Sequence, residues 1–582
     1  MKRLFYTLLF FLPCMLIACG GSDDTPDGDN NPPVVAPPCE EPVDSRLLYN
    51  GIRLPEQWPP VRSSSSELEK GMSPFYLSDK PSVINISVGR QLFVDNFLIE
   101  STNLKRTFYY PEYYSGNPIL TPEQDWEKTG TKGAAFAAPF SDGVWYDEKE
   151  GKYKMWYMAG GGSYATSGAG VTCYAESTDG IHWTKPTLSV VAGTNIVDYN
   201  SERDASVIWL DKQESNASKR YKMFLVARES GKWRYHYKTS PDGKVWRAAV
   251  QSEPIADRST VYKNPFRNVW VYSMRHNVRV DANKLVRARD YNENTDPEAG
   301  TKKAEALLSA FWFGPWANEQ HHTDYPNIAP AIYNQDATPY ESIMLGFFTV
   351  WQGPENNVCD SLNIQKRNEV LIGWSKDGFH WNRENKKPFL PVSEDFHAWN
   401  AGNVQSTAGS PLIVGDSLYF YVSGRYNSKP KHDSNFATGL AMLRRDGFVS
   451  MRAGRKEGYI EIKTQIPANG NYLFVNADVK GTLAVEVLDD NGQPMEGFTK
   501  KDCISMKKSD KTKQMISWEK HPGVTSLVGK TVRLKFYLNQ ADIYAFWISA
   551  WQTGESGGYT GGGGPGLSDE GIDTPMDKLK NN

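Results

Sequence analysis

Hydrophobic and polar residues alternate in short runs through residues 90–552. The runs are rich in Val, Tyr, Trp and Phe and end at Gly, Asp, Asn or Pro, as in "VWYDEKEGKYKMWYM" at Val144–Met158. Alternation with a period of two, interrupted by turn residues, predicts half-buried β-strands. Only Thr301–Phe311 has the spacing of a helix. The pattern therefore predicts an all-β protein.

One short motif recurs within this region. Ser-x-Asp-Gly-x-x-Trp stands at Ser177–Trp183, Ser240–Trp246 and Ser375–Trp381, with a weaker copy around Asp446 and a degenerate one around Asp290. Repeats separated by tens of residues indicate a repeated supersecondary unit. Because Asp-Gly suits a tight turn, we expect the motif to form the turn after the third strand of each unit, with its Trp packed between units.

The repeats divide the chain into five units that predict a five-bladed β-propeller over residues 126–450. The units span residues 126–190, 200–253, 256–295, 322–390 and 400–450. Residues 451–552 lack the motif but still alternate, with turns at Asn469-Gly470 and Asn491-Gly492, and predict a β-sandwich. Residues 46–125 form an N-terminal segment that leads into the propeller.

The two ends of the chain differ from this core. Residues 1–18 read as a signal peptide, with Lys2 and Arg3 before a short apolar run that ends in Leu-Ile-Ala-Cys. The ending resembles a lipobox, which implies lipidation of Cys19 and an outer-membrane lipoprotein on the cell surface; the alternative is a secretory signal with a chance cysteine. Residues 19–45 are a predicted flexible tether, and the Gly-rich residues 553–582 a predicted disordered tail.

Composition limits the classes of function. The chain has 582 residues and a net charge of -3, so no basic excess indicates nucleic-acid binding. Aromatic residues make up 13% of the chain, which suits a large β core or a surface that stacks on sugar rings. The cysteines beyond the signal show no CxxC or Cys/His metal pattern, and we expect buried thiols at Cys39, Cys173, Cys359 and Cys503.

Carboxylates ahead of the innermost strands are the candidate chemistry. In a propeller these strands line the central channel, and Asp204-Ala-Ser-Val-Ile-Trp209 aligns with Asp257-Arg-Ser-Thr-Val-Tyr262. Carboxylates that share one channel repel unless they differ in protonation, and that difference is what general acid/base catalysis of glycosidic cleavage requires. The competing interpretation is that each Asp caps a turn or pairs with its neighbour, Arg203 or Arg258.

The combination of five blades, inner-strand carboxylates and a trailing sandwich resembles the five-bladed glycosidases of families 32, 43 and 68. Glu202-Arg203-Asp204 resembles the Arg-Asp-Pro motif of family 32, with Ala205 in place of the proline. The segment Leu92–Glu100 is the nearest analogue of the first motif of that family, Trp-x-Asn-Asp-Pro. The Glu-Cys motif of its acid is missing, so the substrate does not transfer.

The resemblance implies roles for individual residues. Asp95 would be the nucleophile or base, Asp204 the transition-state stabiliser and Asp257 the acid. Asp142 competes with Asp95, because it lies at the inner strand of the first blade. Asp324 and Glu341 are reserves for the acid, within a substrate-binding set that is completed by Arg203, Arg258 and His322.

Three functions remain open at this level. The first is an exo-acting glycosidase that trims plant or algal oligosaccharides, and the second is a non-catalytic glycan-binding lipoprotein. The third is a propeller lyase that acts on uronic acids with a Tyr or His base. His321-His322, His397 and Asp324 raise a metal option, but adjacent histidines on a strand point to opposite faces. We therefore expect an oligosaccharide as the partner, with no metal and no cofactor.

Overall fold

The computed structural model describes residues 46–62, 71–128, 134–165, 170–199, 202–281, 284–305, 309–362, 364–426 and 435–576. The predicted signal peptide, Cys19, the tether and Cys39 lie outside these residues. Nearly all regular structure in the described part is β-strand, which confirms the all-β prediction. Within the described ranges, no helix is both long and apolar enough to cross a membrane.

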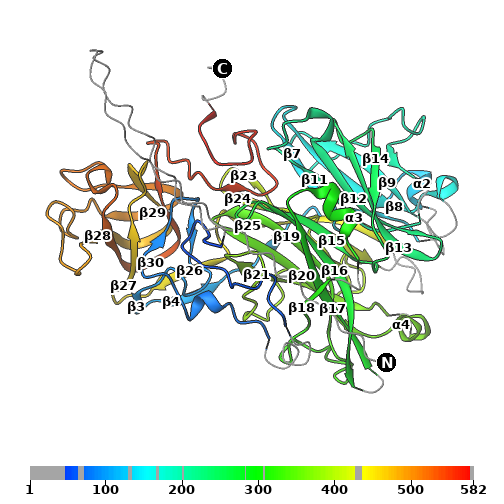
Figure 1. Cartoon of the computed structure of the whole chain (residues 1–582), viewed down its shortest axis with the longest axis horizontal. Coiled ribbons are helices and arrows are strands. Elements are labelled where there is room, and N and C mark those ends of the chain that lie inside the picture. The colour runs from blue at the N-terminus through cyan, green and yellow to red at the C-terminus, as the bar shows by residue number, and fades with distance from the viewer. Residues whose placement is uncertain are drawn as a thin grey trace, which may run out of the picture. The chain divides into compact units, whose positions relative to one another are not determined.

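Five blades follow one another along the chain (Figure 1). The first contains β6 (Ala137–Ala138), β7 (Val144–Asp147), β8 (Lys152–Ala159), β9 (Val171–Ser177) and β10 (Ile196–Asp198). The second contains β11 (Glu202–Leu210), β12 (Tyr221–Glu229), β13 (Lys232–Ser240) and β14 (Arg247–Gln251). The third contains β15 (Thr260–Asn264), β16 (Val269–Asp281), β17 (Lys284–Asn294) and β18 (Ala310–Phe313).

The fourth and fifth blades are continuous as one sheet through a parallel pairing between β21 and β22. The fourth contains β19 (Ala331–Glu341), β20 (Ile343–Gly353) and β21 (Arg367–Ser375). The fifth contains β22 (Asn403–Gln405), β23 (Leu412–Val414), β24 (Ser417–Tyr426) and β25 (Asn435–Arg444). The N-terminal segment supplies β5 (Glu112–Tyr113), which pairs with β25 and completes the last blade.

Hydrogen bonds between neighbouring inner strands or the loops before them close the five blades into a ring. The pairs, donor first, are Ile208 N to Asp142 O, Arg258 N to Asp204 Oδ2, Thr260 Oγ1 to Gln335 O, Asn334 Nδ2 to Ser406 Oγ and Ala408 N to Phe140 O. These pairs join each blade to the next and the fifth to the first. The predicted five-bladed propeller is therefore what the chain forms.

The repeated motif forms the turn that its residues predict. Its copies follow β9, β13 and β21, and in each the Gly amide donates to the motif Ser Oγ at 2.9 Å. Gly180, Gly243 and Gly378 have φ of 75°, 77° and 77°, a left-handed conformation that favours glycine. Asp446 follows β25 in the same way, but Asp290 lies inside β17 and forms no such turn, so the degenerate copy was misassigned.

Helices are few and short. They are α2 (Asp125–Lys128), α3 (Pro297–Lys303) and α4 (Asn356–Leu362), with 3-10 turns η1 (Phe75–Leu77), η3 (Gly162–Tyr164), η4 (Ala217–Lys219) and η5 (Thr525–Leu527). The helix predicted at Thr301–Phe311 is displaced, because Asp296 caps α3 through the Ala299 amide and β18 already begins at Ala310.

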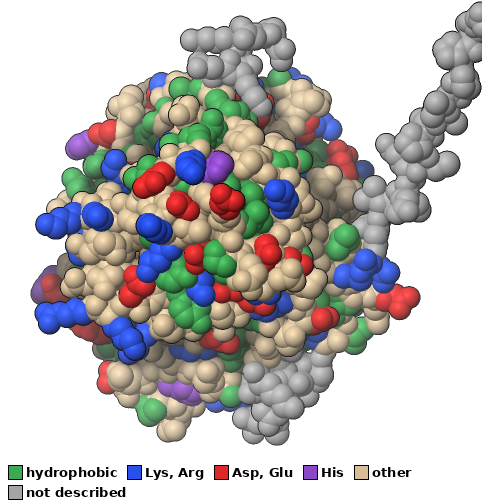
Figure 2. Space-filling view, turned by 90° about the vertical axis from the view of Figure 1, so that its left-hand side faces the viewer, with side chains coloured by type: hydrophobic (Ala, Val, Ile, Leu, Met, Phe, Trp, Pro, Cys, Tyr) green, Lys and Arg blue, Asp and Glu red, His purple; other side chains and the backbone are tan. Residues whose placement is uncertain are grey.

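The sandwich draws strands from both ends of the described chain (Figure 1). Its C-terminal strands are β26 (Val449–Ala453), β27 (Gly458–Gln465), β28 (Tyr472–Leu488), β29 (Met506–Ile516) and β30 (Thr531–Ser549). The N-terminal segment adds β1 (Ile84–Asn85), β2 (Gln91–Leu92), β3 (Ser101–Thr102) and β4 (Lys105–Phe108). Basic and acidic side chains are intermixed over the face at this end of the molecule (Figure 2).

The Gly-rich tail is ordered over residues 553–576, so the prediction of disorder is wrong for this part. Its strand β31 (Tyr559–Thr560) pairs with the end of β19. The tail also bonds blades one and five, since Tyr146 N donates to Gly562 O and Ile413 N to Gly563 O, both at 2.9 Å. Tyr559 contacts Phe266 of the third blade, and Gly571 lies against Lys212 beside the second. The tail therefore touches all five blades where their inner strands end.

Candidate functional site

A narrow hollow lies where the inner strands meet. Every blade contributes to its lining, which includes Ser141, Gly143, Val207, Ile208, Thr260, Val261, Asp336, Ala337, Ala408 and Gly409. Asp336 is the only acidic residue among the residues that line it. A carboxyl group therefore does lie inside the hub, as the sequence predicts. It belongs to Asp336, however, which the sequence pattern did not indicate.

Asp336 is held in a polar, almost fully buried setting. Its Oδ2 accepts hydrogen bonds from Asn334 Nδ2 at 3.2 Å and from the Thr407 amide at 3.3 Å. Burial raises the pKa of Asp336 to about 6, although these bonds and one with Ser141 act in the opposite direction. With this pKa about half of the carboxyl groups hold the proton near pH 6, far more than an ordinary aspartate would, and a proton donor requires the protonated form.

Asp142 and Arg203 form a second buried pair beside the hub. Arg203 Nη2 donates to Asp142 Oδ1 at 2.6 Å, and Arg203 Nη1 donates to Thr172 Oγ1 at 2.6 Å. Burial raises the pKa of Asp142 to about 6 despite the opposing charge of Arg203. Arg203, predicted to bind substrate, has a side chain only 1% exposed and is already paired within the protein.

Asp204 lies near the start of β11 and Asp257 lies in the turn just before β15, so both stand at the beginning of an inner strand, as the alignment of the blades predicts. Arg258 Nη2 binds Asp204 Oδ1 at 2.9 Å, and the Arg258 amide donates to Asp204 Oδ2 at 2.7 Å. Asp257 forms an ion pair with Arg275 and also interacts electrostatically with Arg258. The structure thus brings Asp204, Asp257 and Arg258 together. With Arg275 and Tyr333 they form what we call the mouth cluster.

Backbone strain accompanies this cluster. Arg258 has φ of 56°, in the left-handed region that side chains other than glycine rarely adopt. Phe140, Ser406 and Ala408, beside the hub, also have positive φ. Strain of this kind persists where the surrounding structure over-determines it, and it gathers at functional sites. The mouth cluster remains open to solvent, because the side chains of Asp204 and Asp257 are 14% and 30% exposed.

Tyr333 stands among positive charges. Its hydroxyl accepts a hydrogen bond from Lys366 Nζ at 3.1 Å, and Arg258 lies over its ring at 5.5 Å. Burial alone would raise the pKa of Tyr333, but Lys366 and Arg258 outweigh it and lower the pKa to about 7. Tyr333 can therefore supply a phenolate near neutral pH.

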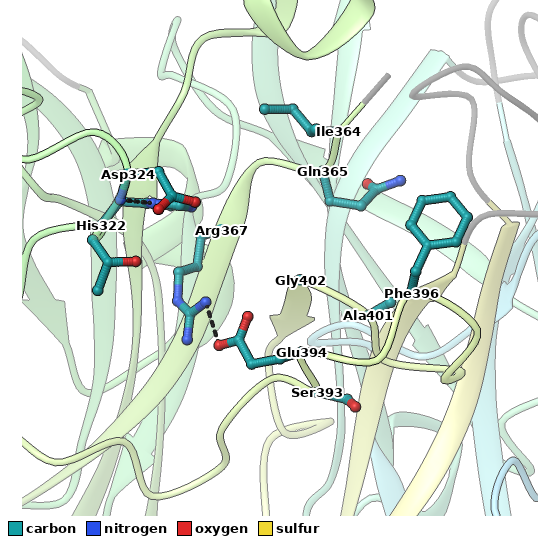
Figure 3. Close-up of a pocket in the computed structure, with 11 residues that line it drawn as sticks. His322, Asp324, Ile364, Gln365, Arg367, Ser393, Glu394, Phe396, Ala401 and Gly402 are labelled. Carbon is teal, nitrogen blue, oxygen red and sulfur yellow. Dashed lines mark hydrogen bonds and ion pairs between the residues drawn. The ribbon is translucent and has the colours of Figure 1, made fainter. Parts of the chain in front are cut away.

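His322 and Asp324 line a separate groove with a cavity volume of about 180 Å³. Figure 3 shows them with Arg367 on one side and Gln365 with Phe396 on the other. The Asp324 amide donates to His322 Nδ1 at 3.0 Å, and Arg367 Nη1 binds Glu394 Oε1 at 2.8 Å. We call this the side groove. Two of its lining residues, Gln365 and Arg367, flank Lys366 in the chain.

Asp95 and Glu341 lie elsewhere. Asp95 sits between Phe93 and Phe97 of the sandwich core, accepts from the Phe97 amide at 2.9 Å and acts electrostatically on Lys376. Glu341 is fully buried at the tail end of β19, bound by Arg90, Arg445 and Ser556. Among the described residues, no hydrogen bond or ion pair joins either carboxylate to the mouth cluster.

The described part of the chain contains no cluster of residues that could bind a metal ion. Within it, no group of three or more His, Cys, Asp or Glu side chains is placed to hold an ion. His321 Nδ1 instead contacts Pro326 O at 2.8 Å, while His322 faces the side groove. Cys173, Cys359 and Cys503 are buried free thiols, as expected.

The sequence did not predict two candidate functional residues, Asp336 and Tyr333. Asp336 stands four residues before Tyr340 in "NQDATPY", close to the five-residue spacing of the second and third blades. That spacing could have found it, had the fourth blade been aligned on Tyr340 instead of Tyr333. No local sequence signal could reveal the cations around Tyr333, because they come from β17, the turn before β15 and the segment before β21.

Comparisons with known proteins give structural matches only. No family model matches the chain, and no curated protein matches it. A solved structure described as a glycoside hydrolase is 13% identical, with a TM-score of 0.36 over 58% of this chain and 92% of that chain. An N-acetylgalactosamine deacetylase from F. plautii, in complex with blood group B trisaccharide, is 12% identical, with a TM-score of 0.36 over 57% and 97%.

A third match is a putative glycoside hydrolase from Bacteroides ovatus. It is 14% identical, with a TM-score of 0.33 over 58% of this chain and 97% of that chain. TM-scores this low carry no argument about the chemistry of this chain, so the function is argued from the mouth cluster and the hub.

Proposed function

We propose that the protein is a glycoside hydrolase that removes terminal sugars from plant or algal oligosaccharides at the mouth cluster. One observation carries this proposal: Asp336 lines the hub, Asp204 and Asp257 belong to the mouth cluster, and the three carboxyl groups differ in their surroundings. Asp336 is buried with a raised pKa, whereas Asp204 and Asp257 are paired with arginines. A carboxyl group with a raised pKa, together with carboxylates paired with cations, offers the acid and the base that cleavage of a glycosidic bond requires.

We assign the proton donor to Asp336 in place of Asp257. Arg289 links the two positions, because it acts electrostatically on both carboxylates. Asp257, the more exposed of the mouth aspartates, is the base or nucleophile, and the Asp204 carboxylate, held in place by Arg258, stabilises positive charge at the sugar ring. This replaces Asp95 as the nucleophile, because Asp95 packs with the sandwich core.

A screen of purified protein against aryl glycosides and plant and algal oligosaccharides tests this proposal through released monosaccharide. We expect turnover by the wild type and its loss in Asp204→Asn and Asp257→Asn, with thermal unfolding showing that both variants fold. Full activity in either variant contradicts the assignment. No turnover on any substrate, combined with saccharide binding, would instead support the non-catalytic glycan-binding function.

Tyr333 favours a second candidate, a lyase that acts on uronic acids. Elimination needs a base to remove the proton next to a carboxylate, and cations to neutralise that carboxylate. Tyr333 with Lys366 and Arg258 supplies both parts. The product distinguishes the two candidates, since elimination leaves an unsaturated sugar that absorbs ultraviolet light and hydrolysis does not.

The location of the protein is also a proposal. A lipid on Cys19 would hold the chain at the outer membrane, with residues 19–45 as the tether. Metabolic labelling with a fatty-acid analogue tests it: labelling of the wild type and its loss in Cys19→Ala support the anchor. Equal labelling of both proteins contradicts it.

A further inference from the structure

Three cations surround the ring of Tyr333. Lys366 Nζ lies 4.9 Å from the ring centroid, Arg287 Cζ 5.3 Å and Arg258 Cζ 5.5 Å. They come from three separate places in the chain, so no local sequence pattern accounts for their meeting. The fold assembles a concentration of positive charge beside the mouth carboxylates.

The carboxylates of this region leave part of that charge unpaired. Asp204 pairs with Arg258, and Asp257 pairs with Arg275. Within the part of the chain that the structure describes, neither Lys366 nor Arg287 has a carboxylate within ion-pair distance: Lys366 bonds the Tyr333 hydroxyl, and Arg287 lies over Tyr333 and Trp351. Withdrawing an unpaired cation from water is costly, which favours binding of an anion at this position.

The cations are also reachable from solvent. Lys366 and Arg287 are half-buried, and the side chain of Arg258 is 17% exposed. Lys366 stands between Gln365 and Arg367, which line the side groove (Figure 3). A saccharide seated at the mouth cluster can therefore place a substituent against Lys366.

We propose that the saccharide bound at the mouth carries an anionic group, a carboxylate or a sulfate, and that Lys366, Arg287 and Arg258 bind it. This inference rests on the proposed site and names its substrate class. The fork of a guanidinium group matches the two oxygens of a carboxylate or sulfate, and charge-assisted hydrogen bonds are stronger than the bonds that a neutral hydroxyl makes. Asp204 and Asp257 would face the neutral part of the same sugar.

Matched pairs of oligosaccharides provide the activity test. Substrates ending in a uronic acid, a sulfated hexose or the corresponding neutral hexose are compared by kcat/KM. We expect the acidic or sulfated member to exceed the neutral one by about 10- to 100-fold, the range of a charged hydrogen bond. Lys366→Met should remove that preference, and Lys366→Arg should restore part of it. Equal kcat/KM on neutral and anionic members overturns the inference.

A binding test separates failure of this inference from failure of the proposed function. Calorimetry with free glucuronate, a hexose sulfate and glucose measures recognition without turnover. Binding of an anionic probe by the wild type, weakened in Lys366→Met and Arg287→Met, supports the inference even if no glycoside is cleaved. The exposed Lys520 provides the control, and Lys520→Met should bind like the wild type.

Two outcomes contradict the inference directly. Equal binding of glucose and glucuronate shows that the cations do not select charge. If inorganic phosphate alone binds and is required for cleavage of neutral sugars, the cations hold a phosphate co-substrate and not a substituent of the saccharide. Thermal unfolding of each variant confirms that the changes act on a folded protein.

Discussion

Asp336 carries the proton in the proposed hydrolysis, and Asp336→Asn should lower kcat by about 10²- to 10⁴-fold, the usual contribution of a general acid. The donor form exists below its pKa of about 6. Wild-type activity should therefore decline as pH rises through about 6. Rates on a chromogenic glycoside across pH measure this decline.

The matched control is Asp490, an exposed aspartate of the sandwich. Asp490→Asn should keep the wild-type rate and pH profile. Unchanged turnover in Asp336→Asn, or a decline in activity far from its pKa, would remove Asp336 from the role of acid.

Tyr333 predicts the opposite pH dependence if the reaction is elimination. A phenolate base forms above the pKa of Tyr333, about 7, so lyase activity should increase as pH rises through that value. Tyr333→Phe should abolish such activity, while in a hydrolase it should act mainly through saccharide binding. Rates of ultraviolet absorbance increase across pH test this, with Tyr472→Phe in the sandwich as the control. A wild-type rate in Tyr333→Phe excludes the lyase.

At the scale of elements, the repeated turn makes a prediction about packing between blades. A Cβ added at Gly243 would lie 2.3 Å from Trp156 Cζ2, and the residue has φ of 77°. Gly243→Ala therefore combines backbone strain with overpacking and should lower the free energy of unfolding by about 2–4 kcal/mol. Denaturant unfolding measures the change.

Gly231 separates the two contributions. It has φ of 79°, but nothing lies within 4 Å of its added Cβ. Gly231→Ala should therefore cost only the backbone strain, about 1 kcal/mol. Equal losses at Gly231 and Gly243 would show that contact with Trp156 adds nothing.

The strands themselves were predictable from the sequence, because short runs rich in Val, Tyr, Trp and Phe end at turn residues, as in β7, β8, β11 and β12. The position of Asp204 and Asp257 was also predictable, since aligned inner strands start at the same end of the hub. The burial of Arg203 and the surroundings of Tyr333 were not, because both depend on residues far apart in the chain.

At the scale of the whole molecule, the ordered tail was the main surprise. A run of glycines favours disorder by composition, but here the absence of side chains lets the backbone pass close to the blades: a Cβ at Gly564 would lie 1.7 Å from Ile413 O. The residues that contact the tail belong to all five blades. The sequence of residues 553–576 alone could therefore not predict that the tail is ordered.

Truncation tests the contribution of the tail. A chain ending at residue 556 loses β31 and its bonds to three blades, so we expect a clear fall in the midpoint of thermal unfolding. Removing residues 577–582 alone, which lie outside the described residues, is the control and should leave the midpoint unchanged. Equal midpoints for the two truncations would show that the tail does not stabilise the propeller.

Because the tail passes the inner-strand ends of every blade, it also determines from which end a molecule can enter or leave the propeller. With that end covered by the tail, a polymer could not pass through the central channel. A product would have to leave at the same end at which its substrate entered. Under the proposed function, a glycan would therefore enter by one end, and each fragment would leave before the next one entered.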